Sequence, residues 1–267
     1  MNGLRLAHVT DLHFGEADQA QAELLAEDVR AAKPDAILNS GDLTRRAERR
    51  EFALAWAFMK SLDAPVLAVP GNHDISPSNL IQRFFSPRRR WLGGLPEGAV
   101  HELALPGVSV FGLDTVRRAH WHLDWSAGGV SHARMERLRL RLRARAEPRC
   151  VLICHHPLRH PASLAWRRLP VNSDALLAML REEGVEAILS GHLHLPQVLR
   201  GAAGDPIQVI TPSGLSNRGS GRCGWSLITL LDGRFTIHAR EFRDGAWGPG
   251  AVTSLSEAPI VSAPAAT

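Results

Sequence analysis

The stretch Gly71-Asn72-His73-Asp74 decides the fold, because it places three polar side chains directly behind a short apolar run. That run, Val66 to Pro70, has the length and composition of a buried strand. An amide oxygen, an imidazole and a carboxylate are therefore predicted at the end of a strand. The ligands of an open α/β sheet bind in the crevice beyond such strand ends, where loops converge.

Four other segments repeat this pattern of an apolar run followed by ligand-type side chains. The runs are LRLAHVT, DAILNS, RCVLIC and EAILS, and the groups behind them are Asp11 with His13, Asp42, His155 with His156, and His192 with His194. We expect all five strand ends to meet in space. Residues i and i+2 of an extended segment point to the same side, so the D-x-H and H-x-H pairs are each predicted to aim two donors at one place.

The chemistry of these groups indicates a catalytic metal centre. Carboxylates, imidazoles and an amide oxygen without a thiolate suit Mn, Fe, Zn or Co better than they suit a Cys-rich structural zinc site. One ion takes about four to six ligands. The strand ends offer more donors than that, so the sequence predicts two ions.

The ordered motifs D-x-H, G-D, G-N-H-D, H-H-P and G-H-x-H resemble the calcineurin-like metallophosphoesterase superfamily. The segments AHVTDLHFG and SGDLTRRAERREF are similar to its bacterial class III cyclic-nucleotide phosphodiesterase branch. The resemblance covers residues 4–242, and five motifs in order are far more specific than any one of them. It implies an α/β fold in which two mixed β-sheets pack as a sandwich flanked by helices.

The resemblance also implies a role for each motif residue. The first metal ion is expected to bind Asp11, His13 and His194, the second Asn72, His155 and His192, and Asp42 is expected to bridge them. The two ions are divalent or of mixed valence, and their identity among Mn, Fe, Zn and Co stays open. His73 resembles the family's active-site histidine that binds no metal, and is expected to contact the scissile phosphate or protonate a leaving alkoxide. Asp74 is expected to orient it.

The chain of 267 residues is 45% hydrophobic and 22% charged, which is typical of a soluble globular protein. We expect one domain over residues 1–253 and a disordered tail over 254–267. No apolar run reaches the length of a membrane span, and MNGLRLAHVT lacks the features of a signal peptide, so a cytoplasmic location is predicted. Cys150, Cys154 and Cys223 are expected to be buried free thiols.

The secondary structure predicted outside the motifs is coarse. Helices are expected over residues 18–32 and 45–62, the second capped by Thr44, and further helices begin at the caps Ser131 and Ser173. HELAL and VSVFGL are expected to complete the first half of the fold. PIQVITPSG, WSLITLL and FTIHAREF are expected to form strands of a second sheet.

Three insertions, over residues 75–100, 115–130 and 158–172, are expected to form the rim of the site, and each combines Trp or Phe with Arg. Arginine supplies most of the cations behind the net charge of +4, and it binds phosphate bidentately. The weaker candidates for substrate contacts are Arg88, Arg89, Arg90, His156, Arg167 and Arg168. Solvated basic loops are the alternative. Surplus histidines of the second insertion, His120 and His122, are expected to be hydrogen-bonding residues.

The predicted function is hydrolysis of a small phosphodiester, such as a 3',5'-cyclic nucleotide, by a metal-bound hydroxide. One alternative is a pyrophosphohydrolase of a nucleotide-linked lipid of the UDP-diacylglucosamine type, whose rim would contact the membrane surface. Another is a metal-binding interaction module without catalysis, which the presence of all seven ligands and His73 argues against. Cyclic nucleotides, glycerophosphodiesters and lipid diphosphates all remain open as substrates. No specific nucleic-acid partner is predicted, and the sequence indicates no oligomeric state.

Overall fold

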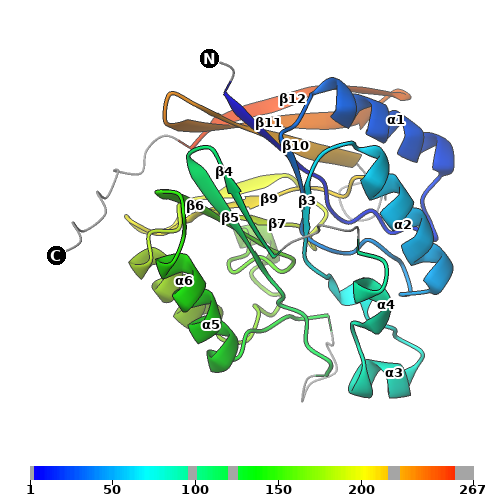
Figure 1. Ribbon diagram of the computed structural model, residues 1–267, viewed down its shortest axis with the longest axis horizontal. Coiled ribbons are helices and arrows are strands. Elements are labelled where there is room, and N and C mark those ends of the chain that lie inside the picture. The colour runs from blue at the N-terminus through cyan, green and yellow to red at the C-terminus, as the bar shows by residue number, and fades with distance from the viewer. Residues whose placement is uncertain (1–2, 96–100, 120–125, 216–222, 256–267) are drawn as a thin grey trace.

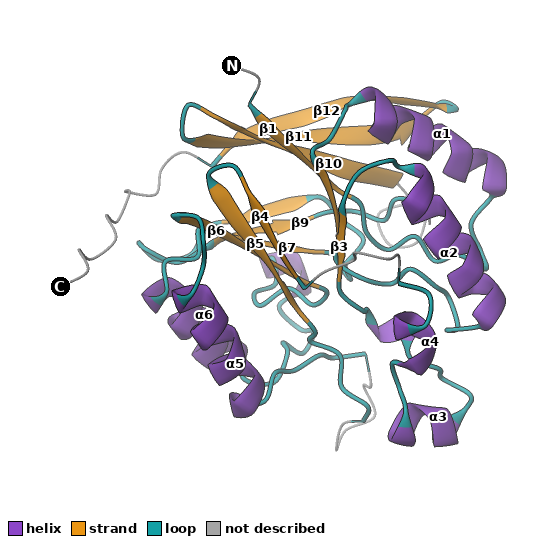
Figure 2. Cartoon of the chain, in the orientation of Figure 1, coloured by secondary structure: helices purple, strands orange, loops and turns teal. Residues whose placement is uncertain are grey.

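Two β-sheets packed face to face form the centre of the molecule (Figure 1). The computed structural model describes residues 3–95, 101–119, 126–215 and 223–255. In these ranges each sheet has six strands, with helices α1 and α2 on the outside of one sheet and α5 and α6 on the outside of the other (Figure 2). The predicted sandwich of two mixed sheets flanked by helices is confirmed.

The first sheet has the strand order β12-β11-β10-β1-β2-β3. Its parallel half contains β1 (Leu4–His8), β2 (Ala36–Asn39) and β3 (Val66–Ala68). Its antiparallel half contains β10 (Cys223–Leu231), β11 (Arg234–Arg243) and β12 (Ala246–Ser254). The expectation that WSLITLL and FTIHAREF belong to the second sheet was wrong, because β10 pairs with β1.

The second sheet has the strand order β4-β5-β6-β7-β9-β8. Its strands are β4 (Glu102–Leu105), β5 (Val108–Leu113), β6 (Arg149–Cys154), β7 (Ala187–Ser190), β8 (Gln197–Leu199) and β9 (Ile207–Ile210). HELAL and VSVFGL, expected as two strands at the end of the first half of the fold, form β4 and β5 at one edge of the second sheet. The hairpin β4–β5 extends this sheet because β5 runs parallel to β6 along its whole length.

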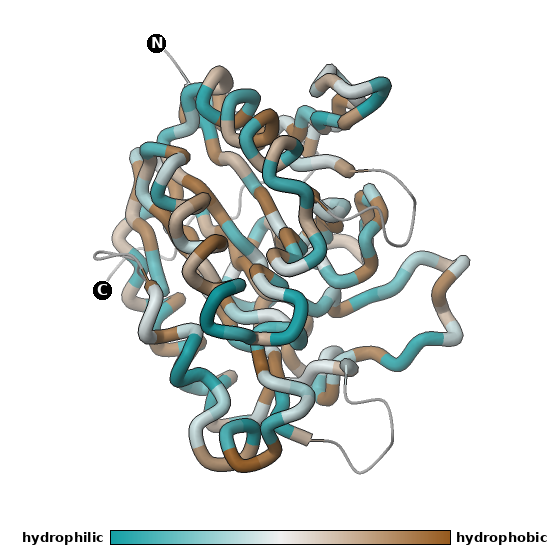
Figure 3. The backbone as a smooth tube through the Cα atoms, turned by 90° about the vertical axis from the view of Figure 1, so that its right-hand side faces the viewer, coloured by the Kyte–Doolittle hydropathy of each residue, from teal (hydrophilic) through white to brown (hydrophobic). Residues whose placement is uncertain are grey.

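Alternating side chains of the strands divide the core into three layers. In β6, Val151 and Ile153 face the other sheet, whereas Cys150, Leu152 and Cys154 pack against α5 and α6. Figure 3 colours the backbone by the hydropathy of each residue. All three cysteines are buried and free, as predicted.

The helices follow the predicted order but differ in their starts. α1 (Gln19–Ala31) is capped by Asp18, and α5 (His132–Arg143) by Ser131 as expected. α2 (Arg49–Ser61) begins later than predicted and Thr44 does not cap it. Instead, the Glu51 carboxylate accepts a hydrogen bond from the backbone N–H of Glu48 at 3.0 Å.

α6 (Ser173–Glu182) also begins differently, because its N-cap is Asn172, in the left-handed conformation, and Ser173 is already helical. The helix ends at Glu182, with Glu183 as its C-cap. In the first insertion, α3 (Leu80–Phe85) and α4 (Arg89–Leu92) are short. None of the helices in the described ranges is long and apolar enough to cross a bilayer.

The C-terminal segment contains a strand that the sequence pattern did not indicate. The tail was expected to begin at residue 254, but β12 includes Ser254, and Leu255 is buried. Gly-Pro-Gly inside β12 hides the strand pattern. Proline is tolerated there because β12 is an edge strand. Residues 256–267, like His120 and His122, lie outside the described residues.

We predict that Trp91 contributes strongly to stability. It is 2% exposed, and its ring lies 5.9 Å from that of Trp56. Trp91→Ala should lower the free energy of unfolding by about 3–5 kcal/mol, because it removes a large buried side chain and leaves a cavity. Urea unfolding measures this, and Trp166→Ala serves as the control because Trp166 is 78% exposed. Equal losses in the two variants would contradict the assigned packing.

Candidate metal centre

The polar groups that follow five strands come together where the ends of the two sheets meet. β1, β2 and β3 of the first sheet lead to Asp11 with His13, to Asp42 and to Asn72. β6 and β7 of the second sheet lead to His155 and to His192 with His194. The site thus takes donors from both sheets.

One group of potential ligands contains two carboxylates and two imidazoles. Ligand atoms of Asp11, His13, Asp42 and His194 all lie within 4.8 Å of one another. His194 Nε2 is 3.1 Å from Asp11 Oδ1, and His13 Nε2 is 3.9 Å from Asp42 Oδ2. All four residues are buried. This group contains the three residues expected at the first ion and the expected bridge.

The spacing of the two imidazoles fits a shared metal ion. His13 Nε2 and His194 Nε2 are 3.1 Å apart. Two nitrogens that bind the same ion, each at about 2.0–2.1 Å, lie about 2.9–3.4 Å apart in octahedral or tetrahedral geometry. Burial lowers the pKa of His13 to about 4, so its imidazole is neutral and retains a lone pair.

A second group surrounds the amide oxygen of Asn72. Asn72 Oδ1 is 3.0 Å from His155 Nε2 and 3.0 Å from His192 Nδ1. The other oxygen contact of His155 Nε2 is Asp42 Oδ2, at 3.4 Å. Asp42 therefore faces both groups of ligands, as a bridging carboxylate must.

His156 also lies beside this second group, but both of its ring nitrogens have other partners. Nδ1 is 2.7 Å from Thr115 Oγ1, and Nε2 donates to the carbonyl of Ser126 at 2.7 Å. Its ring packs against those of His155 and His192. Because His156 is only 2% exposed, it supports the ligand imidazoles from behind, and the expected contact with substrate does not fit this position.

The electrostatics of the site attract cations. Burial alone would raise the pKa of Asp42, but the adjacent His155 and His73 hold it well below the usual range. Although burial opposes the charged form of His155, the Asp42 carboxylate raises its pKa to about 9. A metal ion replaces this proton when it binds, because imidazole coordinates in its neutral form.

The ligand loops adopt a conformation that the sequence did not predict. Asp11 and His13 were expected to be extended, as were His192 and His194, but all four have positive φ between 48° and 66°. Asp42 shares this left-handed conformation, with φ of 53°. Such backbone is uncommon outside glycine and accumulates at functional sites. The donors converge because of these turns and not because of strand alternation.

Glycines let the ligand loops approach one another. A Cβ atom at Gly191 would collide with the Asp11 carboxylate, and one at Gly71 would collide with that of Asp42. Gly41 has φ of +110°, and a Cβ there would lie 2.5 Å from the nitrogen of Gly71. The glycine of each motif is therefore needed for close backbone approach.

A buried polar network below Asp11 was not recognised from the sequence. His8 Nε2 is 2.9 Å from Ser40 Oγ, which donates to Thr10 Oγ1 at 2.8 Å. Thr10 Oγ1 in turn donates to Asp11 Oδ2 at 2.8 Å. The only available signal was a histidine inside an otherwise apolar strand. The network fixes the carboxylate of Asp11, which was expected to bind the first ion.

Asp74 has a different role from the one expected. Its carboxylate accepts hydrogen bonds from the backbone N–H groups of Gly71 at 2.9 Å and Thr44 at 3.0 Å, and from Thr44 Oγ1 at 2.9 Å. Among the described residues, no hydrogen bond of the Asp74 carboxylate reaches the His73 ring. Burial and the charge of Asp42 raise the pKa of Asp74 to about 6. Asp74 therefore joins two ligand loops and does not orient His73.

Arg45, which the sequence did not single out, is the neighbour of the His73 ring. His73 Nδ1 is 2.9 Å from the Arg45 carbonyl oxygen and 2.7 Å from Arg45 Nη1. Glu16 holds the guanidinium through an ion pair of 2.7 Å. The ring of His73 lies 5.0 Å from that of His13, at the edge of the first ligand group. The signal was available, since Arg45 follows the Gly41-Asp42 motif closely.

The rim arginines differ in how they are engaged. Arg88 pairs with Asp114 and donates to the carbonyl of Val116, and Arg90 donates to the carbonyl of Ala47. Arg89 and Arg168 are exposed, and Arg167 is half-buried. Arg88 and Arg90 thus stabilise the first insertion, and their role in binding substrate remains a prediction, as it does for Arg89, Arg167 and Arg168.

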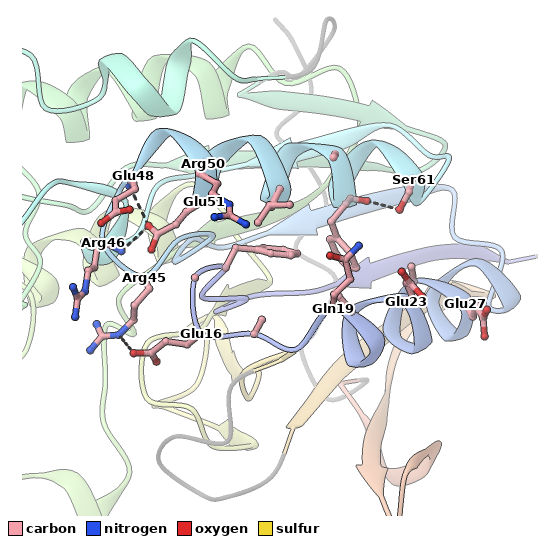
Figure 4. A pocket seen from close by; sticks show the side chains of 18 of the residues that line it. Glu16, Gln19, Glu23, Glu27, Arg45, Arg46, Glu48, Arg50, Glu51 and Ser61 are labelled. Carbon is pink, nitrogen blue, oxygen red and sulfur yellow. Dashed lines mark hydrogen bonds and ion pairs between the residues drawn. The ribbon is translucent and has the colours of Figure 1, made fainter.

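A groove of 1080 Å³ begins at the pair Glu16–Arg45 and runs between α1 and α2 (Figure 4). Phe58 and Ala26 are among its apolar lining residues, and Arg46 and Arg50 are among its charged ones. Because Arg45 also contacts His73, the groove adjoins the candidate metal centre.

Comparison with protein families identifies one match. The family model of the Calcineurin-like phosphoesterases matches residues 4–196 of this chain. This range includes every residue of the two ligand groups.

Curated relatives include enzymes named for two kinds of diester. A "Probable cyclic nucleotide phosphodiesterase" of Pseudoalteromonas is 30% identical over 72% of this chain and 71% of its own length. The 3',5'-cyclic adenosine monophosphate phosphodiesterase of Haemophilus influenzae is 26% identical over 72% of this chain and 70% of its own length. A "Probable glycerophosphodiester phosphodiesterase" of Arcobacter nitrofigilis is 27% identical, and the match spans 61% of this chain and 57% of that relative.

The fold is shared with solved structures of low sequence identity. A dimetal phosphatase from Danio rerio superimposes with a TM-score of 0.67 at 15% identity, covering 96% of this chain and 99% of that chain. This similarity concerns the fold alone.

We predict two metal ions per chain, with Asp42 serving both. Protein prepared with manganese should contain about two ions by elemental analysis. Asp42→Ala should lose metal from both positions, whereas Asn72→Ala should lose less because it removes one neutral donor. Asp174→Ala is the control, since Asp174 is exposed on α6. Full metal content in Asp42→Ala, with the fold intact by circular dichroism, would contradict the bridging role.

Proposed function

This chain belongs to the calcineurin-like phosphoesterase family, and we propose that it hydrolyses a small phosphodiester, with a 3',5'-cyclic nucleotide as the first candidate, at a dinuclear metal centre. The relatives named as phosphodiesterases support a metal-dependent phosphodiesterase. The observation that carries the proposal is the convergence of carboxylate, imidazole and amide donors from five strand ends onto two adjacent positions.

The donor set fits two divalent ions. We propose that Asp11, His13 and His194 hold one ion, that Asn72, His155 and His192 hold the other, and that Asp42 binds both. A pair of such ions would polarise a phosphate oxygen and lower the pKa of a water molecule, and so would supply the nucleophile. The chain therefore does not need a nucleophilic side chain. This agrees with the inert state of Cys150 and Cys154, whose thiols have pKa values raised to about 12 by burial.

His73 is the group best placed to act on the leaving oxygen. Its ring lies beside His13 at the edge of the first ligand group, and its backbone N–H donates to Asp42 Oδ1 at 2.8 Å. Arg45 contacts Nδ1 at 2.7 and 2.9 Å but Nε2 only at 3.4 Å, so Nε2 is the nitrogen better placed to hold or give the proton. The guanidinium of Arg45 adds a fixed positive charge on the same side, where it favours a phosphate anion.

Two observations, one on the site and one on the relatives, support a small diester as the substrate. The residues of both ligand groups are buried or half-buried, so the reacting phosphate must enter between the ligand loops. Two relatives that match 72% of this chain are named as cyclic-nucleotide phosphodiesterases. Glycerophosphodiesters are the second candidate, because one relative carries that name.

We predict that His73→Ala keeps its metal ions but loses roughly 10²–10⁴-fold in kcat on a diester with a poor alkoxide leaving group. The loss should be much smaller on bis(p-nitrophenyl) phosphate, because p-nitrophenolate needs no protonation to leave. His132→Ala is the matched control, since His132 is exposed at the start of α5. A loss of equal size on both substrates would contradict proton donation and favour a positioning role.

A substrate panel tests the proposed function itself. We expect the manganese-loaded protein to have its highest kcat/KM on 3',5'-cyclic nucleotides, a lower value on glycerophosphodiesters and little activity on a lipid-linked diphosphate. Manganese, iron, cobalt and zinc should be compared at equal metal content, and Asp42→Ala provides the blank for contaminating phosphatases. Turnover restricted to the acylated diphosphate would replace the proposal by the pyrophosphohydrolase alternative.

A further inference from the structure

Helix α3 has its polar and apolar sides inverted. Its buried residue is Arg83, which is only 5% exposed. Ile81 and Phe85 are 76% and 84% exposed, and Leu80 and Phe84 are 53% and 40% exposed. A surface helix normally buries its apolar side chains and exposes its charged ones. α3 therefore presents a compact apolar patch to the outside.

Specific hydrogen bonds hold α3 in this orientation. Arg83 Nε donates to the carbonyl of Arg118 at 2.6 Å, and Nη1 donates to that of Ser76 at 3.3 Å. Arg118 Nη1 in turn donates to the carbonyl of Phe84 at 2.8 Å. Burying a guanidinium is unfavourable unless it is well hydrogen-bonded, and these contacts meet that need. These hydrogen bonds keep Arg83 inside, and the apolar residues of α3 are therefore exposed.

Cationic side chains lie directly beside this apolar patch. Ile81 lines a 320 Å³ pocket together with Arg49, Arg89 and Arg90. Arg90 donates to the carbonyl of Ala47 at 2.7 Å. Within the described ranges, neither Arg49 nor Arg89 forms an ion pair. Like charges repel when they gather without a counter-charge, so this pocket favours an anion such as a phosphate group.

We propose that α3 and this pocket form a docking surface for an anionic lipid bilayer. Ile81 and Phe85 enter the boundary between headgroups and acyl chains, while Arg49 and Arg89 contact lipid phosphates. Exposed apolar side chains combined with adjacent arginines are what binding in the plane of such an interface requires. In Figure 1, α3 lies at the lower edge of the molecule, away from both sheets, where a flat surface can reach it.

The charge of the surface distinguishes lipid from a second copy of this chain. A twofold interface brings the same patch of both copies together, so Arg49 and Arg89 would face their own counterparts. Such like-charge contact is unfavourable, whereas an anionic bilayer neutralises these groups. The inference does not depend on the substrate of the metal centre.

Vesicle sedimentation tests the proposal with the full chain. We expect binding to vesicles that contain phosphatidylglycerol, little binding to pure phosphatidylcholine, and release at high salt. The double variants Ile81→Ser/Phe85→Ser and Arg49→Gln/Arg89→Gln should each lower the partition coefficient by on the order of tenfold. Leu140→Ser/Arg137→Gln on α5 is the matched control, because Leu140 is 66% exposed and Arg137 is also exposed.

Three results would overturn the proposal. These are failure to sediment with phosphatidylglycerol vesicles, equal binding by the α3 variants and the control, and self-association that the Ile81→Ser/Phe85→Ser variant abolishes. The last result would assign the patch to an interface between copies of the chain. Thermal unfolding of each variant verifies that the fold is intact, and kcat on bis(p-nitrophenyl) phosphate with Ile81→Ser/Phe85→Ser should equal that of the parent.

Discussion

The burial of two carboxylates, Asp11 and Asp42, is the constraint on which the rest of this structure depends. Both are at most 1% exposed, and they repel each other, so each needs positive charge or donors close by. Imidazoles that follow strands of the second sheet supply part of these donors: His194 contacts Asp11, and His155 contacts Asp42. The two sheets are thereby joined at one end by polar contacts and along their faces by apolar ones. The proposed pair of divalent cations at this junction would stabilise the same carboxylates that the proposed reaction uses.

Asp11 and Asp42 are held in place by a backbone conformation that is unfavourable for residues other than glycine. Asp11 and Asp42 both have left-handed φ values, which persist only when the surroundings fix them. Gly71 and Gly191 leave the space, and Asp74 ties the loop after β2 to the loop after β3. Asp74 thus affects the metal centre through loop geometry. This explains why the carboxylate of Asp74, next to His73 in sequence, makes its hydrogen bonds elsewhere.

Sequence reasoning succeeded where a local pattern decides the structure, and it failed where partners distant in sequence decide it. Apolar runs ending in metal-ligand residues located β1, β2, β3, β6 and β7, and with them the donors. The sheet to which β10 belongs depends on pairing with β1, more than 200 residues away, and no short pattern records that. Likewise, the inward orientation of Arg83 depends on carbonyls of Ser76 and Arg118, which a helical pattern does not reveal. Thr44 was predicted to cap α2, but its hydroxyl donates to Asp74, and the Glu51 carboxylate accepts the hydrogen bond at the start of the helix.

The arginines show why a net charge alone does not locate the surface that binds anions. Arg88 and Arg149 are bound to carboxylates of the same chain, and Arg83 is bound to carbonyls, so these side chains stabilise loops and strands. Their charge contributes to the total of +4 without offering a free guanidinium. Arg45 is different, because its ion pair with Glu16 fixes it beside His73. Arg49 and Arg89 differ again, since they line an open pocket beside apolar residues. We therefore propose that anion recognition is divided between Arg45, fixed beside His73, and a separate basic pocket formed by the start of α2 and the first insertion.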